Sequence, residues 1–427
     1  MQLIVHLCQL GPRELTIFDL DALPYIHGVR AKTTKGPFFD VLEKSLHMNR
    51  DKQFHRQRRR IWDSAFKACA CHPTRLIFLL IARTALSDYA PRVEEFTDQL
   101  LTRLREQNGK PIPLLDNMTY YAYDLMAALA FGRPMNFVKG ESTEVADNIL
   151  KTMTGSLSAF GLLQHIPWLF KALGIVLSIA GPMKEWTDWT ISQMDARRAV
   201  KDATPDLVSH LIANTPDNAA GHQLLYGESR LIISAGGETT SSSLTIIFMH
   251  LATHPKYMVA LRKELQENAA TFHSQHPLPL LDAIINESMR RQPSVFFATQ
   301  RVTPPEGIII NDRFIPGDML VGIPSFALQR DPRNFVHPDD FIPERWLDRP
   351  ELVLRKDAFF PFMVGPYSCA GKGLAMMEMR SVVAKVVKEF DIVLPEGFKS
   401  EEFFEGIKDH FTAGTPRQEV SFVRVNG

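Results

Sequence analysis

Hydrophobic residues recur at three- and four-residue spacing through the first two-thirds of the chain, from Asp51 to about Arg290. This spacing places apolar side chains on one face of an α-helix. After Pro293 the pattern changes to short alternating stretches at residues 307–312 and 319–323. Alternation of this kind predicts β-strands. We therefore expect a mainly α fold with a small β-sheet region, of the α+β class.

The last hundred residues add two further elements. A loop-rich stretch ends at Cys369, and a helix is predicted from Gly371 to about Phe390. The tail from Val420 to Val425 again alternates like a strand. Because the sequence has no internal repeat and no low-complexity linker, we predict a single domain over residues 1–427.

Composition narrows the classes of function. The 48 Lys and Arg residues balance the 48 Asp and Glu residues, so no overall field favours nucleic acid or an anionic membrane. Four cysteines in 427 residues make no disulfide framework, which fits a reducing compartment. The longest unbroken apolar run, Leu76 to Ala82, is far shorter than the ~20 residues that span a bilayer. Residues 1–10 lack the basic region and cleavage site of a signal peptide. The chain as given is therefore expected to be soluble, without a transmembrane anchor.

Cys369 lies in a loop suited to presenting its sulfur. The segment reads Phe362-Met-Val-Gly-Pro-Tyr-Ser-Cys-Ala-Gly371. Gly365 permits a positive φ, Pro366 stiffens the turn, and a helix starting near Gly371 directs free N–H groups at the sulfur. Such surroundings are expected to favour the thiolate, which can act as an axial iron ligand. The alternative is a structural cysteine buried at a helix start.

A second segment joins glycines to an acid and an alcohol. Residues 231–248 have apolar flanks, but Gly236, Gly237, Glu238 and Thr239 occupy the middle of the predicted helix. Two mid-helix glycines cost about 1 kcal/mol each relative to alanine, and close approach of a flat ligand is one reason for them. Glu238 beside Thr239 can relay protons. The alternative is that the hydroxyls only bond back to helix carbonyls.

These two segments resemble the signature motifs of the cytochrome P450 family. Residues 362–371 match Phe-x-x-Gly-x-Arg-x-Cys-x-Gly at every fixed position but one, where Tyr367 stands in place of arginine. Residues 235–239 match Ala/Gly-Gly-x-Asp/Glu-Thr. The resemblance implies a cytochrome P450 fold, with heme b between the long central helix and the cysteine-loop helix and Cys369 as the axial thiolate ligand.

The resemblance also assigns roles to individual residues. Glu238 and Thr239 correspond to the catalytic pair that delivers protons to iron-bound oxygen. The usual arginine pairs with a heme propionate, so Tyr367 is expected to offer a hydroxyl hydrogen bond instead. The expected heme contacts are Cys369, His55, Arg59, Arg301, Phe362, Gly365, Tyr367, Gly371 and Gly236.

Three of those contacts come from outside the two motifs. The basic segment 55–66 places His55 where the family usually has tryptophan and Arg59 at its propionate arginine, with Phe66 in register. Arg301 matches the other usual propionate contact. Taken without the resemblance, the same basic segment reads as a solvated charged face.

A structural ion-pair triad is expected away from the heme. Glu287 and Arg290 lie three residues apart on a predicted helix that stops before Pro293. Residues 341–346 resemble the family's Pro-Glu-Arg-Phe element, whose arginine corresponds to Arg345. We expect Arg345 to join the pair of Glu287 and Arg290.

The sequence departs from the family in two places. The match begins near Gly11, and the family's N-terminal anchor, proline hinge and first helices have no counterpart, which reads as N-terminal truncation. Residues 67–84 read as an insertion, which we suspect to be intron sequence translated through an imperfect gene model. Cys69, Cys71 and His72 within it lack a distant second pair, so they are a weak zinc signal.

The resemblance implies a monooxygenase that inserts one oxygen atom of O2 into a lipophilic substrate, with electrons from NADPH through cytochrome P450 reductase. Fungal members look most similar, so a terpenoid or another secondary metabolite is expected as substrate. A location in the cytoplasm or at the cytoplasmic face of the endoplasmic reticulum is expected, and peripheral membrane contact is compatible with it.

Two alternative functions remain, a non-catalytic heme-binding remnant and a hydroperoxide isomerase or dehydratase of the same fold. Isomerases and dehydratases of this kind usually lack a pair such as Glu238 and Thr239.

The sequence also places the surfaces for these partners. Electrons are expected to enter on the cysteine side, where Lys372, Arg355 and Lys356 offer local positive charge. The expected substrate walls are Ser234, Ala235 and residues 295–298, 411–413 and 159–180.

Overall fold

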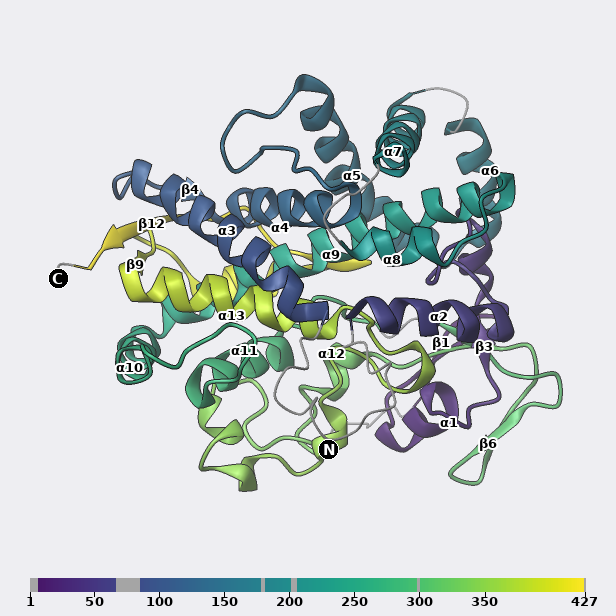
Figure 1. The fold of residues 1–427 in the computed structure, drawn as a ribbon. Helices are drawn as coiled ribbons and strands as arrows, with labels where there is room; N and C mark the ends of the chain where they lie inside the picture. Colours follow the sequence, from purple (N-terminus) through teal and green to yellow (C-terminus); the bar gives the residue numbers. More distant parts are fainter. Residues whose placement is uncertain (1–6, 67–84, 178–180, 201–205, 298–299, 426–427) are drawn as a thin grey trace, which may run out of the picture.

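The computed structural model describes residues 7–66, 85–177, 181–200, 206–297 and 300–425 (Figure 1). The suspected insertion at 67–84, with Cys69, Cys71 and His72, lies outside these residues. Helices fill most of the first two-thirds, as the sequence predicts. The helices are α1 Leu23–His27, α2 Lys52–Phe66, α3 Ala85–Glu106, α4 Leu114–Phe131, α5 Glu144–Leu163, α6 Pro167–Leu177, α7 Pro182–Ala199, α8 Leu207–Ala213, α9 Ala219–Thr253, α10 Pro255–Glu267, α11 Pro279–Arg291, α12 Ser325–Leu328, α13 Lys372–Glu389 and α14 Ser400–Glu405.

The strands are short and form small sheets. The largest has five strands in the order β1-β2-β8-β5-β3. A three-stranded sheet has the order β4-β12-β9, and β6 with β7 and β10 with β11 form two hairpins. The strands are β1 Leu7–Gly11, β2 Glu14–Ile17, β3 Thr34–Lys35, β4 Ile112–Pro113, β5 Arg301–Val302, β6 Ile308–Ile310, β7 Arg313–Ile315, β8 Leu320–Gly322, β9 Phe390–Val393, β10 Lys408–His410, β11 Thr412–Gly414 and β12 Glu419–Arg424. The prediction of a mainly α fold with a small β region is confirmed.

The long helix α9 runs through the centre of the molecule, with α4 on one side and α13 on another (Figure 1). Its 35 residues start at an Asn218 cap, whose side chain accepts a hydrogen bond from the Gly221 N–H. From Leu244 to Leu251 every side chain is buried. A helix that is apolar on all faces needs neighbours all round, and α4 and α13 contribute to the same core.

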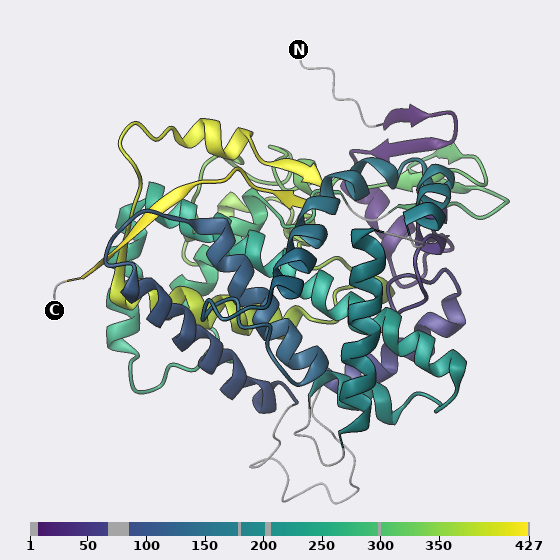
Figure 2. The ribbon, with the colours of Figure 1, turned by 90° about the horizontal axis from the view of Figure 1, so that it is seen from above.

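The N-terminal strands were not predicted from the sequence. β1 and β2 form an antiparallel hairpin, and β2 pairs in parallel with β8 of the last third. Figure 2 shows the purple N-terminal strands beside the green segments of that region. The signal for them in the sequence is the apolar alternation on both sides of the Gly11-Pro12-Arg13 turn.

Other predicted elements are in place. α13 covers the helix expected from Gly371, and β12 covers the strand expected at Val420–Val425. The hairpin of β6 and β7 and the strand β8 fall in the alternating stretches. No helix in the described part of the chain combines the length and the apolar character that crossing a bilayer requires.

Candidate active site

The Cys369 loop has the backbone that its sequence predicts. Gly365 adopts φ +71°, and a Cβ there would lie 2.0 Å from the backbone oxygen of His27, so only glycine fits. The Cys369 N–H donates to the Phe362 oxygen at 2.8 Å and closes the loop. α13 starts just beyond, with Gly371 as its cap. The loop therefore holds the cysteine at the N-terminus of a helix.

The sulfur accepts hydrogen bonds from the backbone N–H groups of Gly371 and Lys372, as expected. Its preferred protonation state differs from the expectation. Burial raises the pKa of Cys369, and the two N–H groups and the charges of Arg59 and Lys372 offset only part of that rise. The idea that the loop alone favours the thiolate is therefore wrong. A coordinated metal ion would itself deprotonate the thiol.

Arg59 ties this loop to α2. Its Nε donates to Asp63 at 2.8 Å, and one terminal nitrogen donates to the Ser368 oxygen at 2.5 Å. The backbone on the N-terminal side of Cys369 is thus fixed by a guanidinium from a distant helix. A heme contact by Arg59 stays a prediction.

α9 opens to space in its glycine-rich middle. Ala235 is exposed, although the nearby Ile233 and Gly237 are buried. The Thr239 hydroxyl lies one turn further on and donates to the Ala235 oxygen at 2.6 Å. Back-bonding by a hydroxyl loosens the helix locally. An open helix face with an alcohol beside it can accept a ligand and pass a proton.

Glu238 points elsewhere, toward α4. The Tyr123 hydroxyl donates a hydrogen bond to its carboxylate, and both side chains are buried. Burial raises the pKa of Glu238 to about 7, although the Tyr123 hydrogen bond lowers it. The carboxyl therefore changes protonation near neutral pH, which suits a proton donor.

The two glycines of α9 also face α4. A Cβ at Gly236 would lie 2.2 Å from the sulfur of Met126, and one at Gly237 would lie 2.8 Å from the Tyr123 ring. The interpretation that their missing side chains make room for a flat ligand is wrong. They let α4 pack closely against α9. Contact between Gly236 and a cofactor stays a prediction.

Positively charged and imidazole side chains gather around Tyr367. The Arg301 guanidinium lies 4.7 Å and the Lys35 Nζ 5.0 Å from the centre of its ring. The His55 ring lies 4.4 Å away. Burial lowers the pKa of His55 to about 3, helped by the charges of Lys35, Arg59 and Arg301. Sequence reasoning predicted His55, Tyr367 and Arg301 but missed Lys35.

This cluster fits a ligand with negative charge. Lys35 and Arg301 are buried, at 2% and 1% exposure. In the described part of the chain neither ring nitrogen of buried His27 has a hydrogen-bond partner. Buried charges and buried polar atoms need compensating partners. The carboxylates of a heme would supply such partners for Lys35 and His27, so the residues fit the cofactor that the resemblance implies.

The predicted ion-pair triad is confirmed. Glu287 accepts from Arg290 at 2.9 Å and from Arg345 at 3.0 Å, and all three side chains are fully buried. The Trp346 indole N–H also donates to Glu287 at 2.9 Å. Arg345 further donates to backbone oxygens, including that of Val336 at 3.0 Å. The triad joins α11 to the loop that precedes the Cys369 segment.

Segments expected to form the substrate walls come together. Phe411 packs on Phe38, with ring centres 5.6 Å apart, and Phe170 stacks on Phe38 at 6.0 Å. The Ala413 N–H donates to the Ser294 oxygen at 2.8 Å, which brings residues 411–413 beside the segment after α11. Ala298 lies outside the described residues. The result is an aromatic cluster of the buried Phe38 and Phe170 with the partly buried Phe411.

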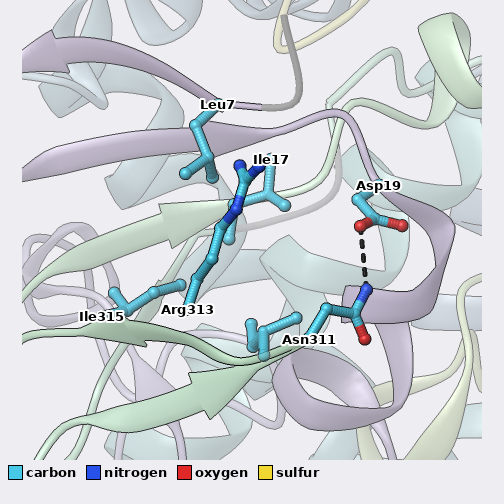
Figure 3. Close-up of a pocket in the computed structure, with 7 residues that line it drawn as sticks. Leu7, Ile17, Asp19, Asn311, Arg313 and Ile315 are labelled. Atoms are coloured by element: carbon cyan, nitrogen blue, oxygen red, sulfur yellow. Dashed lines mark hydrogen bonds between the residues drawn. The ribbon is translucent and has the colours of Figure 1, made fainter.

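A separate small pocket lies between the β1–β2 and β6–β7 hairpins (Figure 3). Leu7, Ile17 and Ile315 line it, and Asp19 accepts a hydrogen bond from Asn311 at 3.1 Å. None of the predicted catalytic or heme-contacting residues lines this pocket, so it is not part of the candidate active site.

The positive charges expected to attract an electron donor differ in ion pairing and in exposure. Arg355 pairs with Asp21 at 2.9 Å and with Asp357 at 3.0 Å, so its charge is largely compensated. Lys372 and Lys356 are exposed. A docking contact of these two lysines with an electron donor stays a prediction.

Comparison with known proteins identifies the family. The sequence model of the family Cytochrome P450 matches residues 71–422. The chain is 35% identical to "Cytochrome P450 monooxygenase orf5" of Eupenicillium brefeldianum, over 97% of this chain and 82% of that protein. It is 33% identical to "Cytochrome P450 monooxygenase FCK2" of Fusarium pseudograminearum, over 97% of this chain and 74% of that protein. It is 32% identical to "Tryprostatin B 6-hydroxylase" of Neosartorya fischeri, over 97% of this chain and 75% of that protein. The family model matches most of the length of this chain. The chain therefore belongs to the cytochrome P450 family and is a cytochrome P450 monooxygenase.

Proposed function

We propose that the protein is a heme-thiolate monooxygenase that inserts one oxygen atom of O2 into a lipophilic fungal secondary metabolite. The observation that carries the proposal is the Cys369 loop. It holds the sulfur at the N-terminus of α13, with two backbone N–H groups directed at it. The relatives support the reaction type, because one of them is named as a hydroxylase.

Cys369 would hold the iron of heme b through its sulfur. A heme with thiolate ligation supplies O2 activation and favours cleavage of the O–O bond. The residues around Tyr367 would hold the heme carboxylates. Thr239, at the open face of α9, would position a proton by its hydroxyl, and Glu238 would hold the proton that is passed on.

The substrate and the electron source follow from the lining and the surface. The rings of Phe38, Phe170 and Phe411 favour a lipophilic molecule, such as a terpenoid or another secondary metabolite. Electrons would come from NADPH through cytochrome P450 reductase, docked near the exposed Lys372 and Lys356.

The test is the carbon monoxide difference spectrum of the reduced protein, which reports whether a thiolate ligates the ferrous heme. We expect the red-shifted Soret band of thiolate ligation in the unmodified protein and in Cys8→Ala. Cys8 is the other free cysteine in the described part of the chain and serves as the matched control. Cys369→Ala should lose the band. Retention of the band in Cys369→Ala, or a histidine-type band in the unmodified protein, contradicts the proposal.

Catalysis needs a separate measurement. The protein is supplied with reductase, isotopically labelled O2 and a panel of lipophilic compounds. We expect at least one compound to give a product that contains one labelled oxygen atom. A thiolate band without any substrate-dependent NADPH oxidation would instead favour the non-catalytic remnant. Conversion of a hydroperoxide without reductase would favour the isomerase or dehydratase.

A further inference from the structure

Lys35 and Arg301 face each other across two short strands. β3 pairs antiparallel with β5, and Lys35 is the direct partner of Arg301 in that register. Both residues are buried. Like charges directly opposite each other destabilise a sheet, and a buried charge is costly unless an opposite charge compensates it. The pairing therefore places two cations side by side, an arrangement that a nearby anion would stabilise.

The protein itself does not supply that anion to Lys35. Its Nζ donates to the backbone oxygens of Leu46 at 3.2 Å and of His47 at 2.5 Å. No carboxylate among the described residues forms an ion pair with it. An ammonium group has three donors, so one N–H remains for a further acceptor.

Tyr367 links Lys35 to the cysteine loop. The Lys35 Nζ lies 5.0 Å from the centre of the Tyr367 ring, and Tyr367 stands where the matching family motif has arginine. An arginine at position 367 would place a third buried cation beside Lys35 and Arg301. Of positions 35 and 367, this chain carries a cation only at Lys35.

We propose that Lys35 is a heme-binding residue that replaces the arginine absent at position 367, and that it supplies, together with Arg301, the positive charge for a heme propionate. The inference rests on the proposed heme-binding function. The proposed cation is specific to this chain. It lies on β3 at Lys35, about 330 residues before the motif position in the cysteine loop at which the family has arginine.

The test exchanges the charge between the two positions. Lys35→Met removes the ammonium but keeps an unbranched side chain. We expect heme transfer from this variant to apomyoglobin to be roughly 10–100-fold faster than from the unmodified protein, the equivalent of one lost charge-assisted hydrogen bond. The thermal midpoint of the heme-free protein should change little, because removal of the buried charge offsets loss of the hydrogen bonds to the Leu46 and His47 oxygens. Adding Tyr367→Arg to Lys35→Met should restore retention to within about threefold.

Two control variants separate charge from structure. Lys52→Met removes a lysine whose Nζ also donates to a backbone oxygen, that of Lys32 at 3.0 Å, but which is exposed. Heme retention should not change in it. Lys35→Arg keeps the charge and should retain heme.

Three results would overturn the inference. They are unchanged heme transfer in Lys35→Met, failure of Tyr367→Arg to restore retention, and a heme-free Lys35→Met protein that is destabilised or does not fold. In the last case Lys35 only ties together the Leu46 and His47 carbonyls. Each of these results leaves the thiolate spectrum of the unmodified protein intact, so failure of this inference is distinguishable from failure of the proposed function.

Discussion

The Tyr123 hydroxyl on α4 donates a hydrogen bond to the Glu238 carboxylate on α9. Both side chains are buried, and burial raises the pKa of Glu238 to about 7. Burial also raises the pKa of Tyr123 well above its ordinary value, so the phenol stays protonated and remains the donor. Glu238 is thus an acid whose proton is available near neutral pH and whose position is set by a residue of another helix.

The first prediction concerns pH. A carboxyl with a pKa of about 7 carries its proton below that pH and loses it above, so coupling of NADPH oxidation to product should fall as pH rises through about 7. Tyr123→Phe removes a hydrogen bond that lowers the pKa of Glu238, so the midpoint should move to higher pH. In Glu238→Gln the side chain cannot gain or lose this proton. Coupling should therefore be low at every pH, without a fall near pH 7.

The neighbouring titratable group lies on α13. Burial raises the pKa of Glu378 to about 8, and Glu378 bonds to Thr240 rather than to Glu238. In Glu378→Gln the fall in coupling should therefore still occur near pH 7. Tyr121→Phe is the control for Tyr123→Phe, because Tyr121 is a buried α4 tyrosine whose hydroxyl accepts a hydrogen bond from Thr97. A midpoint that moves equally in both tyrosine variants would remove Tyr123 from the explanation.

The second prediction concerns the hydroxyl group of Thr239. Thr239→Ala should keep the thiolate spectrum and O2 consumption but lower coupling on the order of tenfold or more, because proton delivery fails while oxygen still binds. Thr253→Ala is the matched control, since Thr253 also donates back to a carbonyl of α9, that of Met249 at 2.8 Å, but near the helix end. Unchanged coupling in Thr239→Ala would exclude Thr239 from the mechanism.

The third prediction concerns the packing of α4 on α9. Gly237→Ala should destabilise the protein by about 1–3 kcal/mol, because its Cβ would overlap the Tyr123 ring. Gly155→Ala is the control. Gly155 lies in α5 with no atom within 4 Å of an added Cβ, so alanine there should stabilise by up to about 1 kcal/mol. Denaturation midpoints measure both, and equal shifts would contradict the packing explanation.

The fourth prediction concerns the buried triad. Glu287→Ala leaves Arg290 and Arg345 buried without their carboxylate and should cost about 3–5 kcal/mol. Glu267→Ala, which removes an exposed partner of Lys263, should cost less than about 1 kcal/mol. Equilibrium unfolding of the two variants provides the comparison. A similar small loss in both would mean that the triad contributes little to stability.

The fifth prediction concerns residues 67–84. The Tyr89 hydroxyl of α3 donates to the Ala65 oxygen of α2 at 2.8 Å, so the end of α2 and the start of α3 lie side by side. A variant that joins Phe66 to Ala85 should give more soluble protein with higher heme occupancy, since it removes an apolar run. Lower heme content in that variant, or transcripts that consistently contain these codons, would show that the segment is native.

Spacing along the chain predicted those features whose residues lie close together, and the family resemblance added a distant one, Arg345 of the triad. The Cys369 loop, the helix after it and the pair of Glu287 and Arg290 follow from spacing and turn chemistry. Lys35 did not stand out, because a single lysine in a loop is usually solvated, and only the pairing of β3 with β5 places it opposite Arg301. The reason given for Gly236 and Gly237 was wrong, because the sequence does not say which neighbour a helix face meets.

The parallel pairing of β2 with β8 has a consequence for biosynthesis. Glu14 is the partner of Leu320, so the first strands find their sheet neighbour only after about 300 further residues have left the ribosome. At synthesis rates of roughly 5–20 residues per second, that delay is on the order of 15–60 s. Throughout it the N-terminal hairpin has an unpaired edge that can join strands of other chains. Nascent chains of this protein should therefore depend on chaperones that bind the β1–β2 hairpin until β8 has emerged.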